Sequence, residues 1–453
     1  MKKLSSIILA AIIVTMVLSL AGCGSEKADP AQQINYTERT FTVIDKLVNN
    51  KVGEFYAYFD DNMKKQVTQS SMQSIWGDII LSYGAFDYYK TDITIVAKDG
   101  YQIVDVPCVF QKGSITLRLS FNSKGEISGF FITDNSTPSN SIQLANDVEV
   151  SFGTEPYLMH GSLTLPEGEG PFPAVILVHG SGPNDRNEQI GPNLPFMDLA
   201  EQLSARGVAV LRYDKRTYSY SNDVASLTDF TVQEETIDDV VAALAYLKEH
   251  PSIQTEQIYI AGHSLGGYLI PRIAQQTPDA AGYIMLAASA RPLEDLMLEQ
   301  TAYILSLEKS LDDASKEKLL NQTQSLVDAI KSVTADTDLT AGQLGGAPAS
   351  YWLDLRAYDP IATVKEINKS FLVMQGGRDY QVTKADYDLW QSAFDSDSDV
   401  HFRYYDNLNH IFMSGTGKST PDEYQQKGVV AETVGTDIAN FVLDHAAIEQ
   451  LLS

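Results

Sequence analysis

The sequence feature that most constrains the fold is the stretch Ile258–Tyr268, which contains a Gly-x-Ser-x-Gly motif at Gly262, Ser264 and Gly266. A short apolar, β-branched run precedes the motif, and apolar residues at helical spacing follow it. A serine at such a strand-to-helix turn is strained and needs small neighbours two residues away on either side. The helix N-terminus behind it would supply N–H donors and partial positive charge. The motif predicts that Ser264 is a nucleophile, although such a motif also occurs by chance in glycine-rich loops.

Length, charge and cysteine content limit the classes of protein that this chain can represent. The 453 residues predict two domains and a targeting segment. Acidic residues outnumber basic ones by 59 to 33, giving a net charge of −26, which argues against nucleic acid or an anionic membrane surface as an electrostatic partner. The two cysteines are Cys23 and Cys108. They cannot form a zinc site or disulfide framework if Cys23 is modified, and Cys108 is predicted to be a small core residue.

The N-terminus has the pattern of an export signal. Lys2 and Lys3 precede an apolar run and the sequence Leu-Ala-Gly before Cys23, which predicts a secretory signal whose apolar run is short for a membrane span. This ending resembles a bacterial lipobox. The resemblance implies a lipoprotein signal peptide over residues 1–22, lipidation of Cys23, a tether over residues 23–35 and an extracytoplasmic protein anchored to the bacterial cell membrane. A plain signal peptide that ends in cysteine is the alternative.

Residues 36–133 are predicted to form a small α+β domain. Apolar residues recur at helical spacing around residues 41–48, 55–67 and 72–80, and alternate with polar residues later, at 115–121 and 127–131. The pattern resembles small cone-shaped domains ahead of some secreted bacterial hydrolases, which implies a spacer or binding accessory. A polar stretch with a proline then predicts a linker over residues 134–146.

Residues 147–453 alternate between strand and helix patterns, which predicts a mostly parallel sheet with helices on both faces. Strands are expected at residues 163–165, 174–178, 208–213, 258–261, 283–286, 371–375 and 400–405. The interval of about residues 291–350 has helical patterns and a glycine-rich tail instead of a strand. We expect it to form a helical cap over the site, and a surface excursion unrelated to substrate is the alternative.

Four motifs make this part of the chain resemble an α/β-hydrolase, and within it the secreted bacterial esterases of the dienelactone-hydrolase and prolyl-oligopeptidase-like branch. They are the Gly-x-Ser-x-Gly motif, the segments His179–Arg186 and Arg212–Arg216, and the segment Gln375–Asp379 with His410 downstream. The resemblance covers about residues 147–450. It implies the α/β-hydrolase fold, a Ser–Asp–His triad in that chain order, and no cofactor or metal.

The candidate triad is Ser264, His410 and Asp379. Serine is a weak nucleophile without an adjacent base, and His410 follows the last predicted strand through a turn-rich segment. A neutral imidazole can take the serine proton near neutral pH. Asp379 lies just past a strand end, where the loops of a parallel sheet gather, and would orient His410. Asp386 falls within a predicted helix, and Asp406 is too close in sequence to His410 to reach it easily.

An acyl-transfer site also needs two donors for the oxyanion. The backbone N–H of Leu265, directly after the serine, is one candidate, and the family resemblance implies that the N–H of Ser181 is the other. Gly180 and Gly182 make the loop around Ser181 pliable. They do not form a dinucleotide fingerprint, because Asp185 occupies the third glycine position.

Charged residues in the segments His179–Arg186 and Arg212–Arg216 are interpreted as an ion-pair network that stabilises the loop around Ser181, with solvated loop charges as the alternative. His179 ends a predicted strand and is expected to shape the following loop. His263 occupies the variable position inside the Gly-x-Ser-x-Gly motif and receives no role.

These predictions together indicate a serine hydrolase that cleaves a small-molecule carboxylic ester through an acyl-enzyme. A serine peptidase, an acyltransferase or a thioesterase would use the same triad, because the pocket and not the fold decides the substrate. A non-catalytic envelope-binding lipoprotein is a hypothesis of another class.

Overall fold

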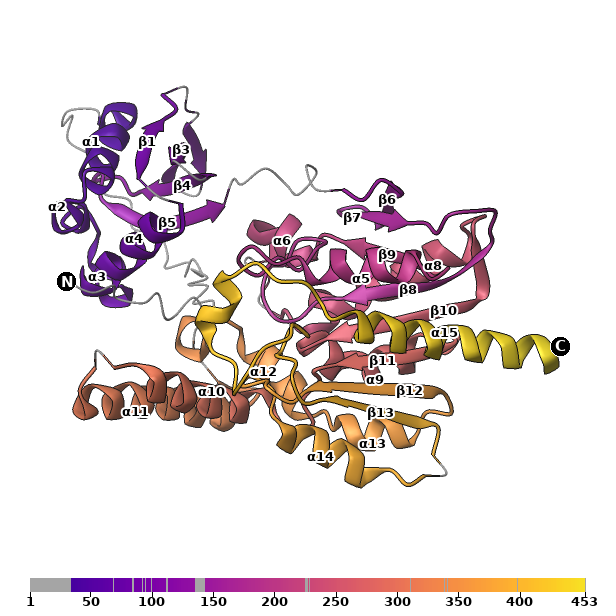
Figure 1. The fold of residues 1–453 in the computed structure, drawn as a ribbon. Helices are drawn as coiled ribbons and strands as arrows, with labels where there is room; N and C mark the ends of the chain where they lie inside the picture. Colours follow the sequence, from indigo (N-terminus) through magenta and orange to yellow (C-terminus); the bar gives the residue numbers. More distant parts are fainter. Residues whose placement is uncertain are drawn as a thin grey trace. The chain divides into compact units, whose positions relative to one another are not determined.

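The computed structural model describes residues 34–452, apart from residues 68, 84, 92, 94, 99, 111–112, 135–142, 225–226, 228, 310, 338, 340 and 397. The predicted signal peptide of residues 1–22, Cys23, nearly all of the tether and most of the linker therefore lie outside the described residues. The described chain divides near residue 141 into two compact units, and each is treated by itself (Figure 1).

The N-terminal unit consists of helices followed by a five-stranded antiparallel sheet. Its elements are α1 (Tyr36–Val48), α2 (Val52–Tyr56), α3 (Asp61–Gln66), α4 (Gln69–Tyr83), β1 (Phe86–Tyr89), β2 (Ile95–Lys98), β3 (Tyr101–Phe110), β4 (Gly113–Phe121) and β5 (Ile127–Asp134). The prediction of a single helix over residues 55–67 is wrong, because α2 ends at Tyr56 and α3 begins at Asp61. Asp60 starts a new helix there by accepting a hydrogen bond from the Met63 N–H, 2.8 Å away.

Apolar side chains from both halves of this unit form its interior. Ile44 and Trp76 from the helices are fully buried, as are Val106 and Leu117 from the sheet. Cys108 of β3 is also buried, which confirms the prediction for this residue, and burial raises the pKa of its thiol to about 12.

The C-terminal unit is built on an eight-stranded sheet in the order β13-β12-β11-β10-β8-β9-β7-β6. The strands are β6 (Asp147–Thr154), β7 (Tyr157–Thr164), β8 (Phe172–Val178), β9 (Ala209–Tyr213), β10 (Ile253–His263), β11 (Gly282–Leu286), β12 (Ser370–Gly376) and β13 (Val400–Tyr405). The six strands from β8 to β13 pair in parallel. This confirms the predicted mostly parallel sheet.

The antiparallel hairpin of β6 and β7 is the part of the sheet that the sequence analysis largely missed. Its second strand was expected only at residues 163–165, and its first was not expected at all. β6 buries Val150 and Phe152 and exposes most of its other side chains. Strands at the edge of a sheet lack the continuous apolar run that marked the central strands.

Helices cover both faces of this sheet (Figure 1). On one face, α5 (Pro195–Ser204) and α15 (Glu432–Leu452) contribute to one apolar cluster. On the other, a larger cluster includes α8 (Asp238–Lys248), α9 (Leu265–Gln276), α12 (Ala349–Arg356), α13 (Pro360–Lys365) and α14 (Lys384–Ala393). Short helices α6 (Arg216–Ser219), α7 (Ser221–Val224), η1 (Gln233–Ile237), η2 (Ala341–Leu344) and η3 (Pro421–Gln425) occupy the connections. In the part of the chain that the structure describes, no helix combines the length and apolar composition needed to cross a bilayer.

The described residues of the interval 291–350 contain helices and no strand. α10 (Leu293–Leu307) and α11 (Asp313–Ser332) form most of it, and α10 contacts the loops that follow the last two strands. Gln300 Nε2 donates to Gln381 O at 2.9 Å, and Tyr303 Oη donates to Ser419 O at 2.9 Å. The interval therefore borders the carboxyl ends of the strands, and its role as a cap stays a prediction.

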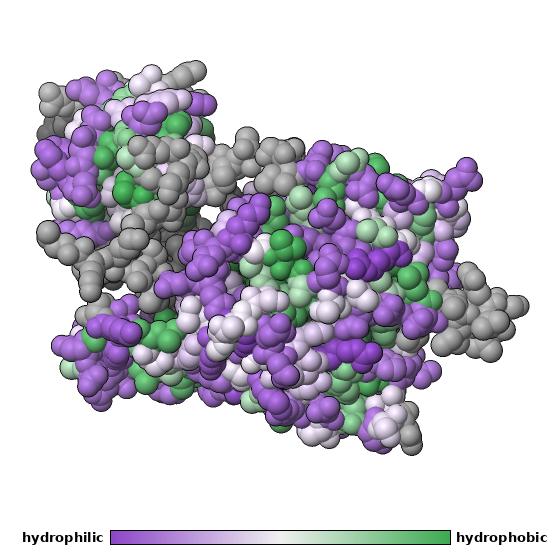
Figure 2. Space-filling view, viewed as in Figure 1, coloured by the Kyte–Doolittle hydropathy of each residue, from purple (hydrophilic) through white to green (hydrophobic). Residues whose placement is uncertain are grey.

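The surface that Figure 2 shows is largely polar, as expected of a chain rich in charged residues. Figure 2 shows a viewed face that is mainly hydrophilic, with apolar residues in small scattered areas. Among the described residues, the large apolar side chains that are most exposed include Val429 at 58%, Val96 at 53% and Tyr88 at 52%. Isolated apolar residues of this kind are normal on soluble proteins.

Candidate active site

Ser264 lies at a sharp turn between β10 and α9, with φ of 52° and ψ of −115°. A positive φ is strained for a residue with a side chain. The neighbouring glycines allow the turn: a Cβ on Gly262 would lie 2.4 Å from the Gly266 backbone, and a Cβ on Gly266 would lie 2.5 Å from Val178 O. The Ser264 N–H donates to Leu286 O of β11 at 2.8 Å. The sequence therefore holds the serine at the carboxyl ends of three parallel strands.

Asp379 and His410 meet on the loops after β12 and β13. Their Oδ2 and Nδ1 atoms are 2.6 Å apart, and each residue is only 3% exposed. Asp379 Oδ1 accepts the N–H groups of Gln381 and Val382, at 2.7 and 3.1 Å, and Oδ2 also accepts from Gln375 Nε2 at 3.1 Å. These bonds hold the carboxylate in place, so His410 carries its proton on Nδ1 and presents Nε2 as a proton acceptor.

The His410 imidazole lies beside the turn that carries Ser264. Its ring centroid is 4.7 Å from that of His263, the residue before the serine, and His263 Nε2 is 3.0 Å from His410 O. Between the described side chains of Ser264 and His410 the structure has no hydrogen bond. Such bonds are often long in unliganded enzymes and shorten when substrate binds. The structure thus joins Asp379 to His410 and places this pair next to the serine.

Asp386, the alternative partner considered for His410, bonds to other residues. It lies in α14, and its Oδ2 accepts from Arg291 Nη2 at 2.7 Å. Its Oδ1 accepts the N–H of Ala290 at 3.1 Å. These bonds tie α14 to the start of the helical interval rather than to His410.

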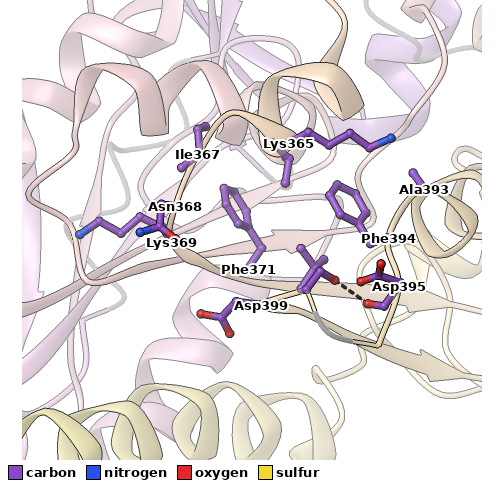
Figure 3. Close-up of a pocket in the computed structure, with 12 residues that line it drawn as sticks. Lys365, Ile367, Asn368, Lys369, Phe371, Ala393, Phe394, Asp395 and Asp399 are labelled. Carbon is purple, nitrogen blue, oxygen red and sulfur yellow. Dashed lines mark hydrogen bonds between the residues drawn. The ribbon is translucent and has the colours of Figure 1, made fainter.

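Two cavities lie near the last strands, and one adjoins the Asp379 loop. It has a volume of about 460 Å³ and is lined by Asp379 and the segments that follow β12 and β13. The other, of about 300 Å³, lies at the opposite ends of these strands, with Phe371 and Phe394 facing into it (Figure 3). Lys369 of this second cavity donates to Ala280 O at 2.8 Å. Because Ser264 lies at the carboxyl ends of the strands, the second cavity is remote from the site.

The loop of residues 179–188, named the oxyanion loop for its predicted donor Ser181, follows β8 and lies against the serine. A Cβ on Gly180 would lie 3.2 Å from Ser264 Cβ. Ser181, next to it, is exposed. Leu265 is the first residue of α9, whose first N–H groups have no partner within the helix. The two predicted oxyanion donors therefore belong to the two segments that adjoin Ser264, and their role stays a prediction.

The ion pairs predicted around this loop are present and buried. Arg186 Nη2 is 2.8 Å from Asp214 Oδ2, and Arg212 Nη2 is 2.7 Å from Asp147 Oδ2. The side chains of Arg186 and Arg212 are 5% and 0% exposed. The alternative of solvated loop charges is therefore wrong for both arginines. The sequence analysis did not assign Asp147, which comes from the unexpected strand β6.

Other buried charges contact this loop: the sequence analysis gave Glu188 no role, and it placed Lys215 in the ion-pair network without predicting its bond to Gly180. Glu188 has a φ of 50°; its Oε1 accepts the Gly180 N–H at 2.6 Å, and its Oε2 lies 2.9 Å from His263 Nδ1. Lys215 Nζ donates to Gly180 O at 2.8 Å and to Glu235 Oε1 at 2.6 Å. A histidine inside the motif and an acid in the loop were visible in the sequence, but only the fold brings them together.

The pKa values of Glu188 and His263 are shifted in opposite directions by their contact. Burial by itself raises the pKa of the Glu188 carboxyl, but His263 and the Gly180 N–H outweigh it, and the pKa is lowered. Burial by itself lowers the pKa of the His263 imidazole, but Glu188 outweighs it, and the pKa is raised. The Nδ1 atom of His263 lies close to Glu188 Oε2, but the two atoms are not aligned for a hydrogen bond. Electrostatic attraction therefore dominates this contact.

His179 is neutral by contrast. Burial lowers the pKa of its imidazole to about 4. The ring packs between Phe196 and Tyr213, with centroid distances of 5.1 Å to each, and Nε2–H donates to Asp185 O at 3.0 Å. This bond closes the oxyanion loop on itself, as expected of a residue that shapes it.

Comparison with known proteins identifies the family. The sequence profile described as the alpha/beta hydrolase family matches residues 175–424, more than half of the chain. The chain belongs to the alpha/beta hydrolase family. The family-level resemblance drawn from the four motifs is therefore confirmed. A second profile, of a domain of unknown function named DUF3887, matches residues 41–130 of this hydrolase, within its N-terminal unit.

The hydrolase is 34% identical over 411 residues to esterase EstD of Thermotoga maritima, an alignment that covers 90% of this chain and 95% of the relative. Similar solved structures include Est1E from Butyrivibrio proteoclasticus, at 18% identity and a TM-score of 0.43, covering 66% of this chain and 99% of that one. A 2,6-dihydroxy-pseudo-oxynicotine hydrolase has 16% identity and a TM-score of 0.42, covering 66% and 68%. The likeness to EstD spans both units of the hydrolase.

We expect His179 to make the hydrolase less stable in acid. Its folded-state pKa of about 4 lies below the unfolded value near 6.5, so the unfolded chain binds more protons between these values. The free energy of unfolding should therefore fall as pH drops from about 6.5 towards 4, by up to about 1.4 kcal/mol per pH unit from this group. In His179→Gln, whose amide can donate to Asp185 O, that slope should be smaller. Urea unfolding at several pH values measures it, and identical slopes in both proteins would contradict the assignment.

Proposed function

We propose that this protein is a serine esterase in which Ser264 attacks a carboxylic ester, His410 transfers the proton, and Asp379 orients His410. The bond of 2.6 Å between Asp379 and His410, beside a serine with positive φ, is the observation that carries the proposal. The 34% identity to esterase EstD over 90% of the chain supports ester hydrolysis as the reaction. The N–H groups of Leu265 and Ser181 are the proposed oxyanion donors.

The first half of the reaction forms an acyl-enzyme. Ser264 Oγ bonds to the acyl carbon while its proton moves to His410 Nε2, and the carbonyl electron pair moves onto the oxygen that faces the two amides. Asp379 keeps its hydrogen bond to Nδ1 and stabilises the imidazolium without taking a proton. The imidazolium then donates its Nε2 proton to the alcohol oxygen, the C–O bond breaks, and the alcohol leaves.

Water completes the cycle by the same route. His410 Nε2 removes a proton from a water molecule as the water oxygen bonds to the acyl carbon. The oxyanion collapses, the proton passes from the imidazolium to Ser264 Oγ, and the carboxylic acid leaves. In both halves of the reaction, His410 Nε2 takes up a proton and then donates it.

We also propose that the mature chain begins at a lipidated Cys23, which would anchor the esterase to the outer side of the bacterial cell membrane. The basic start, the apolar run from Ile7 to Leu20 and the small residues Ala21 and Gly22 support this proposal.

Triad variants test the esterase. With p-nitrophenyl butyrate, kcat should fall roughly 10⁶-fold in Ser264→Ala and His410→Ala, and roughly 10⁴-fold in Asp379→Asn. Asp406→Asn, a change at an exposed acid near His410, is the matched control and should keep the wild-type kcat. Fluorophosphonate labelling should disappear in Ser264→Ala. Labelling that persists in Ser264→Ala would refute the assignment of the nucleophile. Turnover of aminoacyl amides but not of esters would favour a peptidase. A wild-type protein that shows neither labelling nor turnover would favour a binding protein.

Mass spectrometry of the mature N-terminal peptide tests the anchor. In its native membrane, the peptide should begin at Cys23 and carry a thioether-linked lipid. Cys23→Ala should abolish the lipid, while Cys108→Ala should leave it unchanged. An unmodified Cys23, or cleavage at another residue, would rule out the lipoprotein assignment.

A further inference from the structure

Both backbone polar groups of Gly180 are bonded to buried charged side chains. Its N–H donates to Glu188 Oε1 at 2.6 Å, and its carbonyl accepts from Lys215 Nζ at 2.8 Å. Glu188 is 2% exposed and Lys215 is 1% exposed. Lysine and glutamate are rarely buried to this extent unless they are paired. Glu188 and Lys215 both bond to Gly180, which lies next to the candidate nucleophile. We therefore infer that the orientation of Gly180 matters to the site.

Each of the two charges has an opposite partner. Glu188 faces His263, with 2.9 Å between Oε2 and Nδ1, and Lys215 faces Glu235, with 2.6 Å between Nζ and Oε1. Glu235 Oε2 in turn accepts from Tyr351 Oη at 2.7 Å. Lys215 and Glu235 balance each other's charge, and the contact with Glu188 raises the pKa of His263, so neither acid is left without a basic partner beside the serine.

The carbonyl contact fixes the neighbouring amide. A peptide unit is planar and trans, so the Gly180 carbonyl and the Ser181 N–H lie in one plane and point in opposite directions. When Lys215 holds the carbonyl, the direction of the Ser181 N–H is set as well. Glu188 holds the preceding peptide plane through the Gly180 N–H. With both planes held, the glycine cannot use its conformational freedom.

We propose that Lys215 and Glu188 are positioning residues that aim the Ser181 N–H at the oxyanion of the reaction. This inference rests on the proposed function, since it needs an acyl intermediate on Ser264. A donor that is oriented before the reaction stabilises developing charge without having to reorganise. The positive charge of Lys215 on the carbonyl of the same peptide also polarises the Ser181 N–H, which makes it a stronger donor.

The main test removes the charged contact to the carbonyl, which keeps the longer hydrogen bond of 3.3 Å from Asn184 Nδ2. Lys215→Met takes away the ammonium but leaves Glu235 buried and unpaired, so Lys215→Met/Glu235→Gln is studied beside it. The matched control is Arg272→Met/Asp354→Asn, which removes an ion pair of 2.7 Å between α9 and α12 that does not touch the oxyanion loop. Thermal unfolding of the three variants reports their stability.

We expect kcat for p-nitrophenyl butyrate to fall about 10²–10³-fold in both Lys215 variants, because the contribution of one oxyanion donor is lost. KM should change little. The Ki of an alkylboronic acid, which adds to Ser264 as a tetrahedral anion, should rise by a factor similar to the loss in kcat. The control pair should lower stability and leave kcat and Ki near their wild-type values. Glu188→Gln, whose amide oxygen can still accept from Gly180, should show a smaller loss.

The outcomes separate the two proposals. If wild-type hydrolysis does not depend on Ser264, the proposed function fails, and this inference fails with it. If the wild type is active and a folded Lys215→Met/Glu235→Gln variant keeps its kcat and boronate Ki, the positioning role alone is overturned. If the control pair instead loses kcat and raises the boronate Ki as much as the Lys215 variants do, the losses reflect lower stability alone, which also overturns the positioning role.

Discussion

The site depends on how closely the first turn of α9 approaches the ends of β8 and β10. Gly262 pairs with Val178 of β8 on one side and with Met285 of β11 on the other, so the strand that leads to Ser264 is held on both edges. Gly266 packs directly against the end of β8, because a Cβ there would lie 2.5 Å from Val178 O. A positive φ at a non-glycine residue costs on the order of 1–3 kcal/mol, and surrounding packing must hold it. The central parallel strands provide that packing.

Buried ion pairs hold the loop of residues 179–188, which forms the other side of the site from the Ser264 turn. A chain with a net charge of −26 places its cations Arg186, Arg212 and Lys215 in or against the oxyanion loop, and each has an acidic partner within 2.8 Å. Buried ion pairs contribute little net stability once desolvation is included, but removal of one partner is strongly unfavourable. Such pairs therefore suit the task of fixing loop geometry.

The sequence predicted the parts of this structure that depend on local pattern. The central parallel strands are nearly continuous apolar runs, and Asp379 and His410 follow strand ends in the order that the motif requires. The first strand of the β6–β7 hairpin was missed because β6 is the edge strand of the sheet and exposes most of its side chains. The bonds of Glu188 and Lys215 to Gly180 were missed for a different reason. Both bond to the backbone of Gly180, and a contact to backbone leaves no signature in the side chain that makes it.

A crystal structure of the enzyme inactivated by a p-nitrophenyl alkylphosphonate tests the central claim most directly. The account predicts a bond from Ser264 Oγ to phosphorus, with one phosphoryl oxygen about 2.7–3.1 Å from both the Leu265 and the Ser181 nitrogen. His410 Nε2 should lie within hydrogen-bond distance of the remaining oxygens, with Asp379 still bonded to Nδ1. An adduct on another residue, or a phosphoryl oxygen turned to solvent with His410 out of reach, would contradict the account.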